Sequence, residues 1–484
     1  MFNDSPDPDL SLFAALITVT AISYYLSPRA HTVGEFFRGA SESGEAPDVW
    51  TLVLSQVTTW IFARSLLNAG VLGYFYGIAG VLAYAAYYLS FFVGARIVDS
   101  LRFRHGADSV QAYLGANFGR LGPRCYNLIV ALRLISEVFA NLLVVGLLFG
   151  QQGSGIYAVT IIATALVTLG YSMLGGLRAS LRTDVFQAAI LIGLLTVLLA
   201  QTMAAEGFSL PAVLASSPQP DGPGWVLLIV ALLQIWSYPL HDPVMMDRGF
   251  LADRRVTWLS FHRAGWISLA LIVAFGILGV YAGLGKAEGE DLMATLSRLM
   301  GPVSAFLINI ALFVSAVSTL DSTLASAARL CVVDIAKARP TLVAGRWSMV
   351  LFMALGLAML FTGSDDLYAA VAVSGTASLF LAPVVVFGIW GGWRLRPWTY
   401  AIAFVAAITG AVIYFLESSG YIGLVGQLAG VEHNYSKLLA ICASVLLVGA
   451  GAAVCGRVRG RHGEPPAVPA DAAETADGAG NANA

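Results

Sequence analysis

Charged residues are scarce in this sequence. Only 12% of its 484 residues are Asp, Glu, Lys or Arg, whereas 58% are hydrophobic and the mean hydropathy is +0.76. Water-soluble domains usually carry about 25% charged residues. A soluble core cannot hide this much apolar surface, so lipid must be the solvent for most of the chain. The net charge of −2 also gives no support for a nucleic-acid partner.

The sequence also lacks the usual signatures of metal, disulfide and enzyme chemistry. Its four cysteines form neither a CxxC pair nor a metal-ligand spacing. It contains no DxxxD pair and no HExxH run, so we expect no catalytic residues and no organic cofactor. The N-terminus, MFNDSPDPDL, is acidic, whereas a cleavable signal needs a basic segment. We therefore expect the first apolar stretch to be a retained span.

Long apolar runs predict an all-α integral membrane protein of about thirteen transmembrane helices, because a helix needs about twenty apolar residues to cross the bilayer. Residues 1–456 would form one polytopic transmembrane domain, and residues 457–484, rich in Ala, Pro and Gly, a disordered cytoplasmic tail. The run 302–335 is too long for one perpendicular crossing and should tilt or extend past the lipid. The predicted spans are 10–26, 49–76, 77–100, 125–150, 155–175, 184–204, 224–241, 263–284, 302–335, 345–363, 367–391, 396–416 and 435–456.

The basic residues predict the orientation of these spans. With the N-terminus outside, 21 of the 27 Lys and Arg residues fall in the tail and in the loops after spans 1, 3, 5, 7, 9 and 11. The opposite side holds 3, and 3 lie within spans. A split this uneven supports the span assignment. It predicts a multi-pass protein of the cell (inner) membrane, with the N-terminus outside and the C-terminus in the cytoplasm.

The span 302–335 carries a stripe of hydroxyl groups. The spacing i, i+3, i+4 and i+7 places four hydroxyl residues on one helical face: Ser315, Ser318, Thr319 and Ser322. Asp321 lies at the edge of the same face. Hydroxyl and carbonyl oxygens suit a hard monovalent cation that has shed its water. Small hydroxyl residues also let helices pack closely, and Asp321 could equally make a helix–helix hydrogen bond.

The segment GGLRASLRTDVFQ lies between spans 155–175 and 184–204. Two glycines can end one helix, and Thr183 or Asp184 can cap the next. Taken alone, this segment predicts only a helix–turn–helix.

Together, several such segments resemble the sodium:solute symporter family. They are GEFFRGA at 34–40, GGLRASLRTDVFQ at 175–187, STLDSTL at 318–324, and a proline five residues before an arginine (Pro243, Arg248). The resemblance covers nearly the whole chain up to residue 456. It implies the leucine-transporter fold, with a 5+5 inverted repeat formed by spans 2–6 and 7–11 and a broken first helix in each repeat. Because five is odd, consecutive five-helix units must enter from opposite sides.

Only one of the two expected breaks has a local signal. In span 224–241, Pro239 and Pro243 bracket His241 and Asp242, and each proline removes a helical hydrogen bond. Span 49–76 contains TTWIFARSLLNAG, which has no proline. Its break is implied by the resemblance alone.

The resemblance also implies that Na+ is the coupling ion. Five neutral oxygens would hold it weakly enough to leave again, although such oxygens do not exclude proton coupling. The implied sodium-binding residues are Thr58, Ile61 and Ser315 through carbonyls, Ser318 and Thr319 through hydroxyls, and Asp184 near the cytoplasmic exit.

Arg64 departs from the family pattern. An arginine facing a mid-membrane cavity should meet an anion, either a solute carboxylate or an internal partner such as Glu137 or Asp321. Arg133 and Glu137, spaced i and i+4, can also neutralise each other. The residues expected at the solute, where aromatics could equally be packing, are Arg64, Ser65, Glu137, Trp236, Tyr238, His241, Asp242 and Asp321.

The sequence therefore predicts a secondary active transporter in the lipid bilayer. Its partners would be Na+ and a small-molecule solute, an organic carboxylate or an amino-acid-like zwitterion. A membrane sensor that uses the same fold with a separate signalling partner is the alternative.

Overall fold

The structure is a computed structural model that describes residues 10–336, 339–362 and 375–458. Within these ranges the chain is helical, and its β-structure is confined to one isolated bridge between Leu395 and Arg457. Eight helices are long and apolar enough to cross a membrane. Three shorter apolar helices, Leu10–Leu26, Pro223–Gln234 and Gly375–Trp390, accompany them.

Each predicted span overlaps at least one observed helix, and span 367–391 lies partly outside the described residues. The longer helices are α1 (Leu10–Leu26), α4 (Ala63–Ala86), α7 (Leu121–Phe149), α8 (Gly155–Ala204), α13 (Arg254–Leu284), α14 (Leu292–Arg329), α15 (Leu342–Thr362), α17 (Pro397–Ser418) and α19 (Asn434–Cys455). The shorter elements are α2 (Val33–Arg38), α3 (Val49–Trp60), η1 (Tyr87–Leu89), α5 (Ser90–Asp99), η2 (Ser100–Arg104), α6 (Val110–Phe118), α9 (Leu210–Leu214), α10 (Pro223–Gln234), α11 (Tyr238–His241), α12 (Pro243–Gly249), η3 (Leu330–Ile335), η4 (Ser378–Leu381), η5 (Val384–Trp390) and α18 (Leu424–Ala429).

Glycines with positive φ divide the longest helices. The 50 residues of α8 would extend about 75 Å if straight, more than twice the bilayer core. Gly176 (φ 56, ψ −136) breaks α8 into two parts, and Gly77 (φ 61) breaks α4 in the same way. Such angles favour glycine because it has no Cβ. The break at Gly176 also shows that the predicted cap is wrong: Thr183 and Asp184 lie inside the second part of α8.

Both predicted helix breaks are present. α3 ends at Trp60, Ile61 leaves the helical region (φ −91, ψ 70), and α4 starts at Ala63. In the second interrupted span, α11 ends at His241 and α12 follows a non-helical Asp242 (φ −94, ψ 101). Asp242 Oδ1 accepts a hydrogen bond from the backbone N–H of Met245 at 2.8 Å and so caps α12.

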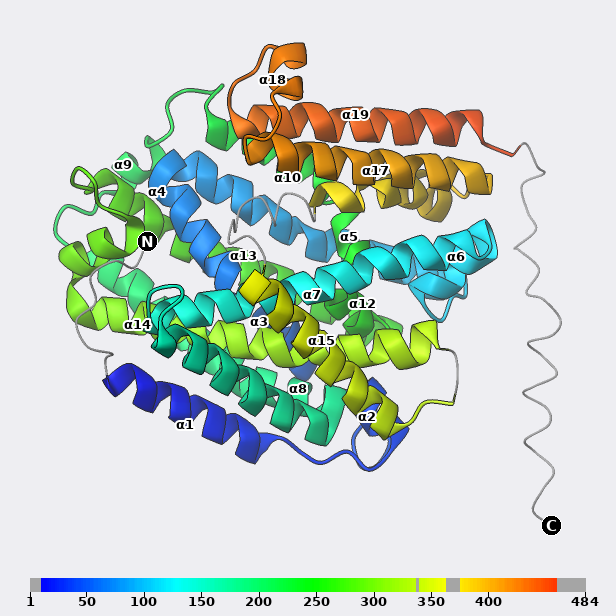
Figure 1. Cartoon of the computed structure of the whole chain (residues 1–484), viewed down its shortest axis with the longest axis horizontal. Coiled ribbons are helices and arrows are strands. Elements are labelled where there is room, and N and C mark those ends of the chain that lie inside the picture. Colours follow the sequence, from blue (N-terminus) through cyan, green and yellow to red (C-terminus); the bar gives the residue numbers. More distant parts are fainter. Residues whose placement is uncertain (1–9, 337–338, 363–374, 459–484) are drawn as a thin grey trace.

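Contacts near the ends of the predicted spans divide into two groups. On the predicted cytoplasmic side, Arg178–Glu35 joins the loops after spans 1 and 5, and Arg254–Asp99 joins the loop after span 7 to the end of span 3. On the other side, hydrogen bonds join the ends of span 2 to the loops after spans 8 and 6: Tyr74–Glu290 and Tyr76–Ser217. α1 begins at one end of the molecule and α19 finishes at the other (Figure 1).

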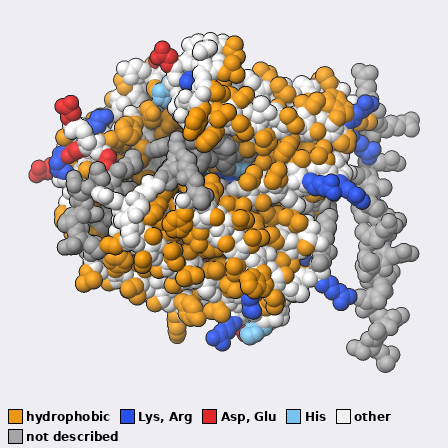
Figure 2. Space-filling view, viewed as in Figure 1, with side chains coloured by type: hydrophobic (Ala, Val, Ile, Leu, Met, Phe, Trp, Pro, Cys, Tyr) orange, Lys and Arg blue, Asp and Glu red, His pale blue; other side chains and the backbone are white. Residues whose placement is uncertain are grey.

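The visible surface has the polarity of a membrane protein. Figure 2 shows hydrophobic side chains over the middle of the face, with Lys and Arg mainly towards its right-hand and lower edges and Asp and Glu at the left and top. An exposed apolar surface of this extent needs lipid or protein to cover it.

Glycines let α4 and α13 approach until their backbones touch. A Cβ added to Gly279 on α13 would overlap the carbonyl oxygen of Gly70 on α4. One added to Gly73 would likewise press on the carbonyl of Gly276. Backbone atoms cannot rotate aside, so a larger residue must separate the two helices. Small residues support close packing of this kind in membranes.

We expect Gly279→Ala to destabilise the fold by about 1–3 kcal/mol, the usual range for overpacking. Gly170→Ala on α8 is the matched control, since nothing lies within 4 Å of its added Cβ. Alanine favours a helix over glycine, so this control should be neutral or slightly stabilising. Thermal unfolding in detergent would measure both, and equal melting temperatures would contradict the packing argument.

Candidate ion and solute site

The break after α3 meets the hydroxyl stripe of α14. Ser315 Oγ donates a hydrogen bond to the carbonyl of Ile61, and Thr319 Oγ1 donates to the carbonyl of Ser315 at 3.0 Å. Thr58 lies one turn earlier, at the end of α3, where helix carbonyls have no intrahelical donors. These residues and Ser318 are fully buried. The structure thus joins Ser315 of α14 to Ile61 at the end of α3, and Thr58, Ser318 and Thr319 each lie within four residues of one of these two.

Asp184 occupies a second polar cluster beside this junction. Its Oδ1 accepts a hydrogen bond from Ser318 Oγ at 2.7 Å, and its Oδ2 accepts one from Ser55 Oγ at 2.6 Å. Arg248 Nη2 lies 3.6 Å from Oδ2, and both charged side chains are fully buried. Arg248 also donates to Ser322 Oγ at 2.8 Å. In the sequence Arg248 is only a motif residue, and nothing local indicates that its partner is Asp184.

Asp321 faces α8. Its Oδ2 accepts hydrogen bonds from Tyr171 Oη at 2.9 Å and from Thr183 Oγ1 at 2.8 Å. These are the helix–helix contacts considered as the alternative to a solute role. The structure does not bring Asp321 together with Arg64.

A small aromatic cavity begins at the break between α3 and α4. Three of the expected solute contacts line it, Ser65, Tyr238 and Asp242. His241 lies against the Tyr238 ring, at 4.9 Å between centroids. Half of its six rings come from the run YAAYYL at 84–89, whose tyrosines were not among the predicted site residues. The full lining is Trp60, Phe62, Ser65, Tyr84, Tyr87, Tyr88, Arg133, Tyr238 and Asp242.

Arg133 and Glu137 form an internal ion pair. Arg133 Nη2 lies 2.6 Å from Glu137 Oε1, and both side chains are buried. The pairing expected from their i, i+4 spacing is therefore present.

Trp236 is a correction to the expected solute contacts. It is 43% exposed, and its ring packs edge-on against Trp390, so it does not line the aromatic cavity. It lies between α10 and α11, where the interrupted helix turns its side chain outwards.

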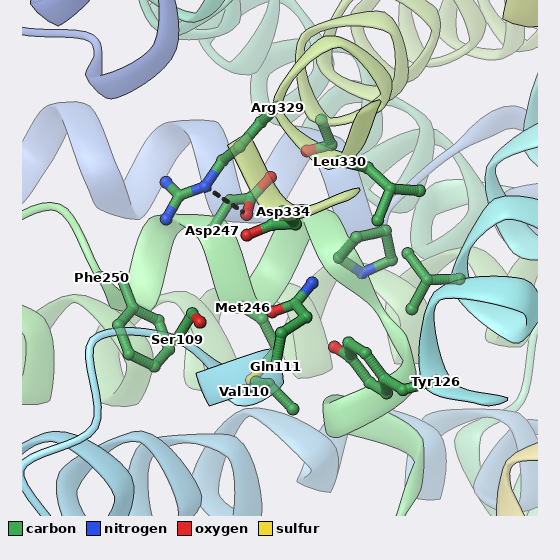
Figure 3. Close-up of a pocket in the computed structure, with 13 residues that line it drawn as sticks. Ser109, Val110, Gln111, Tyr126, Met246, Asp247, Phe250, Arg329, Leu330 and Asp334 are labelled. Carbon is green, nitrogen blue, oxygen red and sulfur yellow. Dashed lines mark ion pairs between the residues drawn. The ribbon is translucent and has the colours of Figure 1, made fainter. Parts of the chain in front are cut away.

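A second pocket, here called the inner pocket, lies along α12 (Figure 3). It is lined by side chains from α6, α7, α12, α14 and η3. Within it Arg329 Nε lies 3.2 Å from Asp247 Oδ1, and the Asp334 side chain lies close by. Asp242 lines the aromatic cavity, whereas Pro243, Met246 and Asp247 line the inner pocket. The start of α12 therefore borders both spaces.

No protein-family model matches this chain. Over 207 residues it is 26% identical to the Schizosaccharomyces pombe "Probable urea active transporter 1", and over 208 residues 27% identical to the Bos taurus "Sodium-coupled monocarboxylate transporter 2". The Saccharomyces cerevisiae "Urea active transporter" is 25% identical over 197 residues. These matches cover 40%, 41% and 38% of this chain, but only 29%, 32% and 25% of the relatives.

The whole fold has known counterparts. A substrate-bound, outward-open Na+-coupled sialic acid symporter superposes with a TM-score of 0.66 at 17% identity, covering 93% of this chain and 98% of that one. The resemblance to sodium:solute symporters is confirmed. A nucleobase-cation-symport-1 family transporter, closed with bromovinylhydantoin bound, gives a TM-score of 0.54 at 14% identity, covering 86% and 94%. The predicted all-α fold class is that of these symporters.

Proposed function

We propose that this chain is a secondary active transporter that carries a small organic solute together with Na+ by alternating access. The contact between the α3 break and the α14 hydroxyls carries the proposal. The oxygens of Thr58, Ile61, Ser315, Ser318 and Thr319 come from two separate elements and are buried together. A sodium ion held by them would tie α3 to α14, and its departure would release that tie.

The ion and the solute would share the same break. Ile61 offers its carbonyl to the ion, while its neighbours Trp60 and Phe62 line the aromatic cavity. Fixing the backbone at Ile61 therefore also fixes two rings of the cavity. Each ligand should then tighten the other by the same factor, because coupling between two sites is reciprocal. The sodium gradient supplies the work.

The inner pocket provides a route for release. It adjoins a cavity lined by residues of the loops after spans 1, 3 and 9, including Arg38, Asp108 and Pro340. All three loops belong to the predicted cytoplasmic side. In this proposal the N-terminus lies outside the inner membrane, and the Arg329–Asp247 ion pair separates when the inner side opens.

The relatives support a small solute without selecting one. Two are named for urea and one for monocarboxylates. The matched region covers under a third of each, so its solute is not inherited from their names.

Uptake by reconstituted proteoliposomes tests the proposal. A panel of small labelled solutes would be offered under an inward Na+ gradient, an equal inward K+ gradient, and an inward pH gradient. We expect concentrative uptake of at least one solute only with Na+, and its loss when a sodium ionophore collapses the gradient. Uptake driven equally by K+, or by the pH gradient alone, would contradict sodium coupling.

A further inference from the structure

The two carboxylates near the aromatic cavity, Glu137 and Asp242, already have hydrogen-bond and ion-pair partners within the protein. Glu137 Oε1 faces Arg133, and its Oε2 accepts a hydrogen bond from Thr323 Oγ1 at 3.2 Å. Asp242 Oδ1 caps α12, and its Oδ2 lies 3.5 Å from Arg133 Nη2. Each of the four carboxylate oxygens therefore has a donor. Both carboxylates are thus already engaged by the protein's own donors, and Arg133 supplies a positive charge to each of them.

Several buried hydrogen-bond donors, by contrast, have no partner in the described part of the chain. Arg64 is 1% exposed, and its Nε and Nη1 have no hydrogen-bond partner in the described part of the chain. The same holds for Nε and Nη1 of Arg133 and for Nε1 of Trp60. Asn68 Oδ1, one turn after Arg64, is an unpartnered acceptor, but a neutral amide cannot balance a guanidinium. Buried donors normally find partners, so this excess calls for an acceptor.

The ion pairs of this cluster are shared unevenly. Arg64, Arg133, Glu137 and Asp242 have a net charge of zero, but both carboxylates pair with Arg133. Among residues 10–336, 339–362 and 375–458, Arg64 has no ion-pair partner. A guanidinium does not lose its proton, and a buried charge without a direct counterion is costly. Among these residues Arg64 therefore lacks a direct counterion.

Arginine side chains also lie near two of the aromatic rings, Phe62 and Tyr238. The Arg64 guanidinium carbon lies 5.4 Å from the Phe62 ring centroid, and that of Arg133 lies 5.9 Å from the same ring and 5.6 Å from Tyr238. These distances are those of cation–π contacts. The protein's own cations thus occupy the positions that a cationic solute would need on these two rings.

We propose that the transported solute is a small monocarboxylate, whose carboxylate pairs with Arg64 and whose compact apolar or aromatic body lies among the rings. One carboxylate matches the one unpaired guanidinium. An arginine fork binds a carboxylate through two parallel hydrogen bonds, which also fixes its orientation. This inference rests on the proposed function, because it assigns the aromatic cavity to the transported solute.

Matched acids and amides test the charge requirement. Purified full-length protein in saturating Na+ would be titrated with benzoate against benzamide and with propanoate against propanamide, followed by thermal shift and by calorimetry. We expect an acid to bind at least about tenfold more tightly than its amide, because the amide keeps the shape but loses the charge. Equal binding of acid and amide would overturn the proposal. So would failure of every acid in a panel of two to ten carbons.

Variants of Arg64 test whether this residue produces the preference for an acid over its amide. Arg64→Gln should lose on the order of 10–100-fold in acid affinity and most of the preference over the amide, whereas Arg64→Lys should keep the preference in part. Arg298→Gln is the control, since that arginine is 45% exposed and pairs with Glu290. An Arg64→Gln protein that still prefers the acid as strongly would overturn the assignment.

A sodium readout separates this inference from the transport proposal. The Na+-induced thermal shift should persist in Arg64→Gln, which also shows that the variant is folded. Loss of acid preference with an intact sodium response supports both. An intact sodium response and sodium-driven uptake without acid preference would refute only the monocarboxylate. Absence of any sodium response in the unaltered chain would refute the coupled transporter itself.

Discussion

Replacing Arg248 by methionine is expected to lower the free energy of unfolding by about 3–5 kcal/mol, the usual cost of removing one partner of a buried ion pair. Asp184 would then remain fully buried with its charge uncompensated. Its serine donors would persist, but hydroxyls do not neutralise a carboxylate. Both side chains are fully buried in this structure, so water does not reach the carboxylate to replace the guanidinium. Thermal unfolding in detergent would show the loss as a large drop in melting temperature.

Arg254→Met is the matched control. Arg254 lies only 2.6 Å from Asp99, closer than the 3.6 Å between Arg248 and Asp184. It is 65% exposed, however, and exposed pairs contribute about 0–1 kcal/mol. Burial, and not distance, should decide the order of the two effects. If Arg248→Met and Arg254→Met have equal melting temperatures, removing Arg248 does not leave a destabilising charge at Asp184.

A double variant separates charge from packing. Arg248→Met with Asp184→Asn leaves neither charge buried, so it should recover part of the lost stability. Should the double variant be less stable than Arg248→Met alone, lost hydrogen bonds rather than the charge would explain the effect.

The position of this ion pair explains why its loss should also abolish transport. Ser55 belongs to α3, Asp184 to α8, Arg248 to α12, and Ser318 and Ser322 to α14. Both interrupted helices therefore meet in one buried cluster, next to the expected ion ligands. Any movement of α12 towards the inner pocket must carry Arg248 with it and change what Asp184 contacts.

Features set by neighbouring residues could be predicted from the sequence. The hydroxyl stripe follows from 3.6 residues per turn, so its common face was visible in the spacing alone. Pro239 and Pro243 each remove a backbone N–H that a continuous helix would use, and the second break was predicted from them. The break at Gly301 before the span 302–335 also agrees with the apolar runs.

Features set by distant residues could not be predicted in this way. The carbonyl of Trp60 at the first break accepts hydrogen bonds from Tyr88 Oη at 2.8 Å and from Ser65 Oγ at 3.1 Å. These donors lie beyond the broken helix turn, so no local signal marks the break at Ile61. The Asp184–Arg248 pair and the outward turn of Trp236 depend on tertiary packing in the same way.

Thr319→Val should raise the Na+ concentration needed for half-maximal uptake by about 10–100-fold. Valine keeps the shape of threonine and removes only the hydroxyl, whose interaction with a charged partner is worth about 1.5–3 kcal/mol. Thr319 is preferable to Ser318 for this test. Ser318 Oγ also donates to Asp184, so Ser318→Ala would disturb two interactions at once. Sodium-dependent uptake in proteoliposomes measures the shift.

Thr319→Ser supplies the control, since it removes the methyl group and keeps the oxygen. In this structure the Thr319 hydroxyl donates to the Ser315 carbonyl, so a purely structural role would lower the melting temperature of Thr319→Val without changing its sodium requirement. If the Thr319 hydroxyl binds the ion, Thr319→Val should instead raise the sodium requirement with little change in melting temperature. At saturating Na+ the solute KM of Thr319→Val should return to that of the unaltered chain, because coupling acts through ion occupancy. Equal sodium requirements in the Val and Ser variants would remove Thr319 from the ion site, and with it the tie between α14 and the break at Ile61.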